Sequence, residues 1–308
     1  MGIRGIGMFI EILKVIFIGI VEGITEWLPI SSTGHMLLVD QFIKLKADAD
    51  FKEMFFVVIQ LGAIIAVIYM YWGKLWPFRI IRQELIEESR PRKKKRDSRW
   101  KNEIKIGSIG ISRPILLIWA KVIVATLPAA VLGLLLDDWM DKYAHTPAVI
   151  AVALIVYGVL FILVEDRNKK RPPKITKLSQ LTYLDALKMG LFQTLAIVPG
   201  TSRSGATIVG ALTMGVSRKL AAEFSFFMSI PIMFGWSLIK VIKFGFHYSV
   251  LEFFELLIGM IVAFIVSVFV IKFLMGYIKK NDFKIFGYYR IALGLLVIVI
   301  FTIKAIIS

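Results

Sequence analysis

The sequence predicts an all-α integral membrane protein, and three observations carry that prediction. Of the 308 residues 57% are hydrophobic, the apolar residues gather in stretches long enough to cross a bilayer, and the chain contains no cysteine. So much apolar surface exceeds what one globular core can bury, which excludes a soluble or a disordered protein. Without cysteine, neither a disulfide-stabilised secreted domain nor a thiolate metal site can form.

Six stretches have the ~20 apolar residues that a helix needs to cross a hydrocarbon layer of ~30 Å. Each of them is expected to span the membrane as a helix. They cover residues 54–72, 115–136, 147–164, 222–244, 251–275 and 286–307.

Two further apolar stretches, residues 8–39 and 182–214, are interrupted midway. The interruptions are ITEWLPISSTGH (24–35) and IVPGTSRSGAT (197–207), both rich in Pro, Gly, Ser and Thr. Irregular backbone at membrane depth is tolerated only where protein buries it or where it lines a water-filled cavity. The sequence therefore predicts two re-entrant segments with a site at their breaks.

The distribution of Lys and Arg along the chain predicts on which side of the membrane each loop lies. The chain has 38 Lys and Arg against 22 Asp and Glu, and in a membrane protein such an excess gathers in cytoplasmic loops rather than marking nucleic-acid binding. Residues 73–114, 165–180 and 276–287 carry thirteen, six and three Lys or Arg, whereas 137–146 carries one and 246–250 none. We therefore expect the first three loops to be cytoplasmic and the last two, with both termini, to be external.

The two halves of the chain are weakly similar to each other. GIVEG (19–23) aligns with GLFQT (190–194) at an offset of 171 residues. This predicts two repeats, residues 1–165 and 166–308, each with one re-entrant segment followed by three spans, and a long basic cytoplasmic insertion at 73–114 in the first. Because three is odd, the second repeat would be inverted relative to the first, with the site near the midplane where the halves meet.

The first break carries two carboxylates and a run of polar groups. Glu22 and Glu26 lie one helical turn apart on the same face, and in an apolar segment they should face the protein interior or water. Close like charges raise the pKa of one of them, which makes a shared proton available. Ser32, Thr33 and His35 follow with two hydroxyls and an imidazole. The pattern favours acid/base work, metal binding or a proton path over a purely structural ion pair.

The second break suits a phosphate. Its glycines allow an irregular turn, its hydroxyls donate hydrogen bonds, and the guanidinium of Arg203 can bind phosphate oxygens bidentately at the start of a following helix. The alternative is that Arg203 is an internal counter-ion of Glu22 or Glu26. The candidate residues of this loop are Gly200, Thr201, Ser202, Arg203, Ser204, Gly205 and Thr207.

With EGITEWLPISSTGH (22–35) and PGTSRSGAT (199–207) in order along the chain, and YYRIALG (288–294) after them, the sequence resembles the undecaprenyl-pyrophosphate phosphatase family, also called the bacitracin-resistance protein family. The resemblance implies a hydrolase that converts undecaprenyl pyrophosphate to the monophosphate and inorganic phosphate. Such an enzyme recycles the lipid carrier for cell-wall polymers, gives bacitracin resistance, and lies in the plasma membrane with its active site open to the outer face.

The resemblance also assigns roles to residues. The catalytic set is Glu22, Glu26, Ser32, His35 and Arg203, and the pyrophosphate-binding set is Thr33, Gly200, Thr201, Ser202, Ser204, Gly205 and Thr207. The sequence leaves open whether His35, Ser32 or water is the nucleophile. It predicts no organic cofactor, and a divalent cation, Mg²⁺ or Ca²⁺, would be held by Glu22 and Glu26. The expected partners are a polyprenyl pyrophosphate and the lipid bilayer, and no nucleic acid is expected. The sequence leaves open whether the protein forms a homo-oligomer.

The alternative is a secondary transporter or lipid flippase. Inverted repeats with broken helices are equally typical of transporters, in which Glu22 and Glu26 would form a proton-coupled pair. The arginine-serine loop together with His35 favours the enzyme, because transport alone needs no potential nucleophile.

Overall fold

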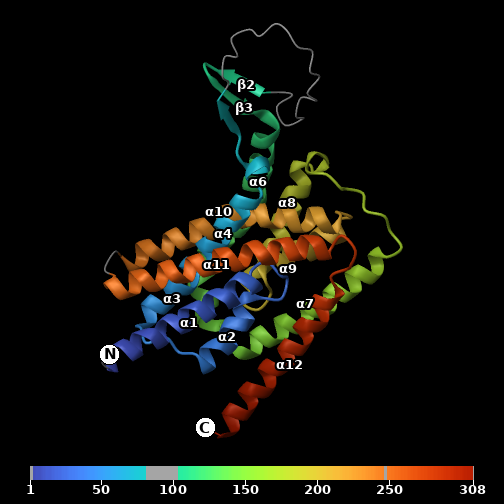
Figure 1. Cartoon of the computed structure of the whole chain (residues 1–308). Coiled ribbons are helices and arrows are strands. Elements are labelled where there is room, and N and C mark those ends of the chain that lie inside the picture. Colours follow the sequence, from blue (N-terminus) through green and yellow to red (C-terminus); the bar gives the residue numbers. More distant parts are fainter. Residues whose placement is uncertain (1–2, 81–102, 246–247, 308) are drawn as a thin grey trace.

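The computed structural model describes residues 3–80, 103–245 and 248–307 (Figure 1). The six predicted spans are confirmed as helices long and apolar enough to cross a membrane, so the chain is a multi-pass membrane protein. The first span is two helices in series, α3 and α4, which meet at Ile59. The spans are α3 (Ala49–Val58) with α4 (Gln60–Met70), α6 (Arg113–Tyr143), α7 (Pro147–Asn168), α10 (Arg218–Phe244), α11 (Val250–Tyr277) and α12 (Lys284–Ile307).

The first broken segment is a hairpin of helices. It consists of α1 (Ile3–Thr25) and α2 (Ser32–Phe42), joined by an irregular turn over residues 26–31. The backbone N–H of Lys46 donates to Oε2 of Glu11 at 3.0 Å, and Nζ of Lys14 donates to the carbonyl oxygen of Lys44 at 2.7 Å. The chain thus returns, after the break, to the end at which it entered.

The second broken segment returns in the same way. It consists of α8 (Tyr183–Thr194), a 3₁₀ turn (Leu195–Ile197) and α9 (Arg203–Thr213). The backbone N–H of Lys174, before α8, donates to the carbonyl oxygen of Gly215, after α9, at 2.8 Å.

The two hairpins enter from opposite ends of α10. Near the end of α10 the ring of Phe244 lies 6.1 Å from that of Phe51, in the apolar cluster that also holds Leu45 beside the first hairpin. At its start Arg218 pairs with Glu165, close to the connection that begins the second hairpin. Opposite entry is what an inverted arrangement requires. The symmetry of the halves and their boundary at residue 165 stay predictions.

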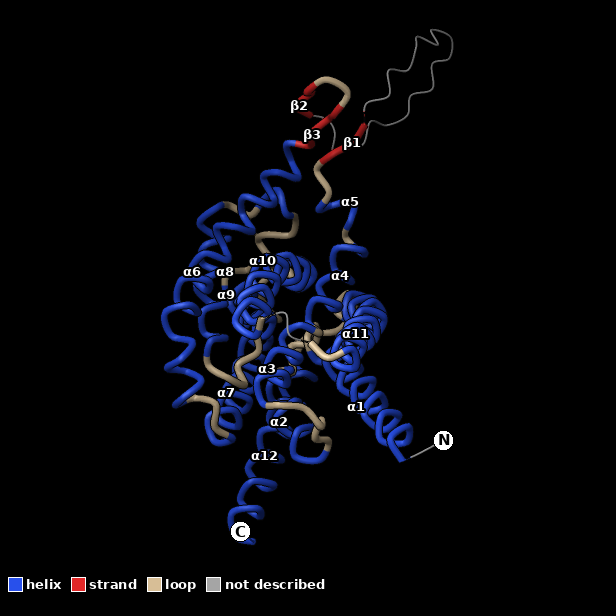
Figure 2. Tube along the Cα trace, turned by 90° about the vertical axis from the view of Figure 1, so that its left-hand side faces the viewer, coloured by secondary structure: helices blue, strands red, loops and turns tan. Residues whose placement is uncertain are grey.

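A small antiparallel sheet, which the all-α prediction did not include, projects beyond the helices (Figure 2). After the short helix α5 (Trp72–Leu75), strands β1 (Phe78–Ile80), β2 (Glu103–Ile106) and β3 (Ile109–Ser112) pair in the order β1-β3-β2. Alternating isoleucines favour this pairing. The basic charge of the insertion predicts its side of the membrane but not its secondary structure. Its basic run at residues 90–96 lies outside the described residues.

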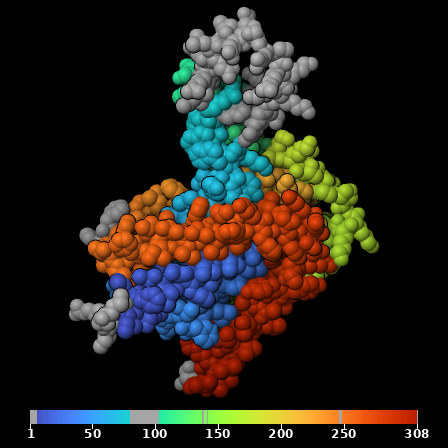
Figure 3. Space-filling view, viewed as in Figure 1, coloured from blue at the N-terminus to red at the C-terminus, as the bar shows by residue number. Residues whose placement is uncertain are grey.

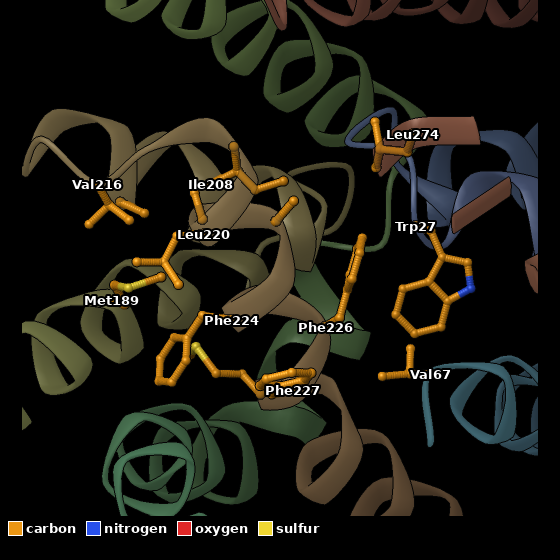
Figure 4. Close-up of a cluster of buried hydrophobic side chains, with 14 of the residues drawn as sticks. Trp27, Val67, Met189, Ile208, Val216, Leu220, Phe224, Phe226, Phe227 and Leu274 are labelled. Atoms are coloured by element: carbon orange, nitrogen blue, oxygen red, sulfur yellow. The ribbon is translucent and has the colours of Figure 1, made fainter. Parts of the chain in front are cut away.

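The core lies around the paired hairpins and α10. Figure 4 shows Trp27, from the first break, beside Phe226 of α10, and the two rings meet edge to face with centroids 5.2 Å apart. Figure 3 shows α11, α1 and α12 together on one face. Large apolar side chains such as Phe269, Phe273 and Leu295 are exposed on α11 and α12, as expected of surfaces that contact lipid.

Candidate active site

The breaks of the two hairpins meet at one cavity of about 670 Å³. Its wall combines the end of α1, the start of α2, the loop before α9 and parts of α3, α6 and α10. Seven of the residues predicted from the sequence line it together: Glu22, Glu26, Ser32, Thr33, Gly200, Ser202 and Arg203.

Each break ends on a serine with unusual backbone geometry. Ser31 and Ser202 are the non-glycine residues with positive φ in the described chain, at 75° and 70°. Each caps the helix that follows it: Oγ of Ser31 accepts from the N–H of Gly34, and Oγ of Ser202 accepts from the N–H of Gly205. Such backbone strain costs ~1 to 3 kcal/mol per residue and persists where the surrounding structure enforces it, often at functional sites.

Two helix N-termini therefore begin at the cavity. Ser32 and Thr33 open α2, Arg203 opens α9, and all three line the cavity. The unpaired N–H groups and the dipole at a helix N-terminus favour an anion. Together with the guanidinium of Arg203 they provide donors for an anion on this wall of the cavity.

Glu26, Arg203 and Ser32 form one hydrogen-bonded network. Nη2 of Arg203 donates to Oε1 of Glu26 at 3.0 Å, and Oγ of Ser32 donates to Oε2 of the same carboxylate at 3.1 Å. Nη1 of Arg203 is fixed by the carbonyl oxygen of Ser225 at 2.9 Å, and its guanidinium lies 5.8 Å from the ring of Trp27. The counter-ion role considered for Arg203 is therefore present, with Glu26 as the partner.

Glu22 and Gln193 are buried polar side chains with unused hydrogen-bonding atoms. Glu22 is 1% exposed and Gln193 is 2% exposed, and among the described residues Oε1 of Glu22 and both Oε1 and Nε2 of Gln193 have no hydrogen-bond partner. Both line the cavity. Because an unpaired buried polar group costs ~1 to 3 kcal/mol, these atoms are suited to groups that enter the cavity.

The sequence analysis missed Gln193, although a signal for it existed. It occupies the position 171 residues after Glu22, in the very segment that aligns the two halves. Two further lining residues were not predicted for the site: Lys240, which pairs with Glu53, and His145, in the stretch 137–146 that was expected to be external.

His35 faces away from the cavity, unlike the other members of the predicted catalytic set. Its Nδ1 lies 2.7 Å from the carbonyl oxygen of Ser31 and its Nε2 lies 2.7 Å from the hydroxyl of Tyr289, on which its ring stacks. A carbonyl oxygen only accepts, so Nδ1 carries a hydrogen and Nε2 can accept from the tyrosine. Nδ1 is thus engaged at the N-cap of α2 itself, and Nε2 holds α2 against α12.

Four predicted binding residues support the loop rather than line the cavity. Thr207 donates to the carbonyl oxygen of Arg203 at 2.9 Å, and Oγ of Ser204 lies 3.2 Å from Oγ of Ser202. Gly205 packs against Ser202 and α12. Thr201 is 1% exposed and borders a separate apolar groove beside α7.

Gly200 is the glycine of the loop at which positive φ and close packing coincide. Its φ is 90°, and a Cβ built on it would lie 2.6 Å from the carbonyl oxygen of Ile150. Any side chain here would push the loop away from α7 and displace Ser202 and Arg203 from the cavity.

Comparison with known proteins shows the family of the chain. The chain is 58% identical to an undecaprenyl-diphosphatase of Enterococcus faecalis, over 95% of this chain and 98% of that protein. It is 54% identical to proteins of the same name from Desulfitobacterium hafniense, over 97% and 99% of the two chains, and from Acetivibrio thermocellus, over 95% and 98%. The profile of the bacitracin resistance protein BacA family matches residues 15–296. The chain belongs to the bacitracin resistance protein BacA family.

Proposed function

We propose that the protein hydrolyses undecaprenyl pyrophosphate to undecaprenyl monophosphate and inorganic phosphate, and so recycles the lipid carrier for cell-wall synthesis and gives bacitracin resistance. The observation that carries the proposal is the Glu26, Arg203 and Ser32 network at two helix N-termini. It places an anion-binding cation, a hydroxyl and a carboxylate on one cavity. Relatives named diphosphatases over the full length favour this activity over the transport alternative.

Ser32 is the nucleophile in this proposal. Its hydroxyl already donates to Glu26, so the carboxylate can take its proton as Oγ attacks the terminal phosphorus. The P–O bond to the bridging oxygen breaks, and undecaprenyl monophosphate leaves as that oxygen takes the proton from Glu26. The regenerated carboxylate then takes a proton from water, the water oxygen attacks the phosphoserine, and Oγ of Ser32 leaves with that proton as inorganic phosphate is released. His35 is a less suitable nucleophile because neither of its nitrogens faces the cavity.

Arg203 holds the phosphoryl group during both steps. When the pyrophosphate enters, the guanidinium has to share its contacts between Glu26 and the phosphate oxygens. Its Nε, which is buried and has no partner in the described part of the chain, provides a further donor. Preorganised donors of this kind stabilise the charge that builds on the equatorial oxygens of a phosphoryl transition state.

A divalent cation, Mg²⁺ or Ca²⁺, fits Glu22 better than Glu26. Mg²⁺ is commonly held by one or two carboxylates together with substrate phosphate oxygens. Oε1 of Glu22 has no partner within residues 3–80, 103–245 and 248–307, whereas both oxygens of Glu26 are engaged by Arg203 and Ser32. Among the described residues no group of three or more His, Asp or Glu gathers. When bound, the cation would neutralise part of the pyrophosphate charge.

The cavity would open to the outer face of the plasma membrane. Met140, His145 and Lys240 line it, and they lie at the end of α6, at the connection to α7 and in the last turns of α10. The basic loops lie at the other end of these helices, which the charge rule assigns to the cytoplasm. Small residues of α6, among them Ala130 and Gly133, face Trp236 of α10 and leave an apolar path suited to the prenyl chain.

The test is release of inorganic phosphate from undecaprenyl pyrophosphate by the purified protein in detergent, beside Ser32→Ala and Thr33→Ala. We expect release by the wild type, none by Ser32→Ala, and a modest change in Thr33→Ala, which removes a neighbouring hydroxyl of the same helix turn. A chelator should lower the rate, and added Mg²⁺ or Ca²⁺ should restore it. A folded wild type that releases no phosphate would contradict the proposal.

A further inference from the structure

Arg290 is a completely buried arginine in α12, far in sequence from both breaks. It is 0% exposed, although its side chain is permanently charged. Within the described residues its guanidinium forms no ion pair and instead lies 5.5 Å from the ring of Tyr157. A buried charge without a carboxylate partner is costly, so the contacts that it makes require an explanation.

Its donors are directed at main-chain carbonyl oxygens of the two breaks. Nη1 donates to the carbonyl oxygen of Pro29 at 3.3 Å, and Nη2 donates to those of Gly200 at 2.9 Å and Thr201 at 2.8 Å. Nε reaches the carbonyl oxygen of Leu154 in α7 at 3.5 Å. One planar side chain therefore joins the first break, the second break and a spanning helix.

The contacts are placed equivalently in the two breaks. Pro29 precedes Ser32 by three residues, and Gly200 precedes Arg203 by three residues, at the offset of 171 that relates the two halves. Arg290 thus donates to equivalent carbonyl oxygens in the two turns, two residues before the serine with positive φ that caps the next helix. The distance between the hydroxyl of Ser32 and the guanidinium of Arg203 depends on the relative position of these two turns.

We infer that Arg290 is a positioning residue for the phosphatase reaction, which fixes the two turns so that Ser32 and Arg203 act on the same phosphoryl group. The inference rests on the proposed function. A rigid fork with five donors can satisfy several carbonyl oxygens at fixed angles, whereas an ammonium or an apolar side chain cannot. Stability alone does not call for a charge here, since well-packed apolar residues commonly replace buried charged groups without loss.

The first variant is Arg290→Lys, assayed for kcat, KM and thermal unfolding. In this variant the substrate can still bind to Arg203 and the apolar path for the prenyl chain, but the turns of the two breaks are no longer joined by the guanidinium. Since a misplacement of about 1 Å costs on the order of 10²-fold in rate, we expect kcat to fall about 10²-fold while KM changes less than about threefold. The affinity for a non-hydrolysable methylene-bridged analogue of the substrate should change as little as KM.

Gly205→Ala disturbs the same contact from the other side. A Cβ on Gly205 would lie 2.9 Å from Nη1 of Arg290, so the guanidinium must shift although its charge is kept. We expect the same selective fall in kcat, smaller than for Arg290→Lys. This second variant keeps the inference testable if Arg290→Lys does not fold.

The control is Arg218→Lys, which weakens the ion pair with Glu165 at the far end of α10. It should lower the unfolding temperature without changing kcat per folded molecule. If Arg290→Lys and Gly205→Ala behave like this control, or like the wild type, the positioning role is wrong while the phosphatase proposal stands. A wild type that releases no phosphate would instead overturn the proposed function itself.

Discussion

The two breaks share a backbone geometry but differ in chemistry. Each ends on a serine with positive φ that caps an eleven-residue helix, and each returns its hairpin to the end at which it entered. The first break places carboxylates and a hydroxyl at the cavity, whereas the second places a guanidinium and loop donors there. Equivalent positions hold Glu22 and Gln193, and Ser32 and Arg203. The same fold element thus supplies reactive groups in one half and binding groups in the other.

Among variants that keep Ser32, Arg203→Ala should have the largest effect, because it removes the formal positive charge that the second break brings to the site. An arginine that stabilises a phosphoryl transition state is worth ~10³ to 10⁵ in rate, so kcat/KM should fall by that order. The assay is phosphate release per folded molecule. Arg203→Lys keeps the charge but loses the planar guanidinium, so its kcat/KM should lie between those of the wild type and Arg203→Ala. A folded Arg203→Ala with near wild-type activity would contradict the assignment of phosphate binding to the second break.

Glu26→Gln tests the reactive half. The amide keeps the shape of the side chain but cannot take the proton of Ser32, and loss of a general base costs ~10² to 10⁴ in kcat. Pre-steady-state and steady-state rates of phosphate release measure this loss. The matched control is Glu11→Gln, which removes a carboxylate from the same helix at the far end of the hairpin. Equal losses in the two variants would refute a specific role for Glu26.

Gln193→Leu tests whether the second break and its hairpin contribute to substrate binding, at the position equivalent to Glu22. The apolar replacement removes two unpartnered polar atoms from the cavity wall, so the protein should become slightly more stable while the substrate loses a hydrogen bond. A lost bond to a charged group is worth ~1.5 to 3 kcal/mol, and we expect KM to rise about 10-fold to 10²-fold. Unchanged KM with raised stability would show that Gln193 does not contact substrate.

His35→Ala should have the smallest effect on chemistry. It removes two hydrogen bonds, to Ser31 and Tyr289, and the loss of stability should be ~1 kcal/mol for each. We expect kcat to fall less than about 10-fold, well below the loss in Ser32→Ala. Chemical unfolding and kcat measured on the same preparation separate the two effects. A loss as large as that of Ser32→Ala would return His35 to the catalytic set.

Much of the fold follows from local sequence, since long apolar stretches become helices and Pro, Gly and Ser break them where predicted. The site was predictable where a motif lies directly at a break, as with Glu26 and Arg203. The direction of His35 was not, because the partner that turns it away is Tyr289 in the last helix. Arg290 and Gln193 gain their roles from contacts across the whole chain. The small sheet was not predicted, because the basic charge of its segment indicates the side of the membrane and not the secondary structure.

The central claim is that Ser32 on the first break attacks a phosphoryl group that the second break holds. The most direct test is the stereochemical course at the transferred phosphorus, followed with an isotopically chiral thiophosphate analogue in the wild type and in His35→Ala. Two successive in-line displacements predict net retention in both proteins and no turnover in Ser32→Ala. Net inversion would mean that water attacks directly, which would contradict the account.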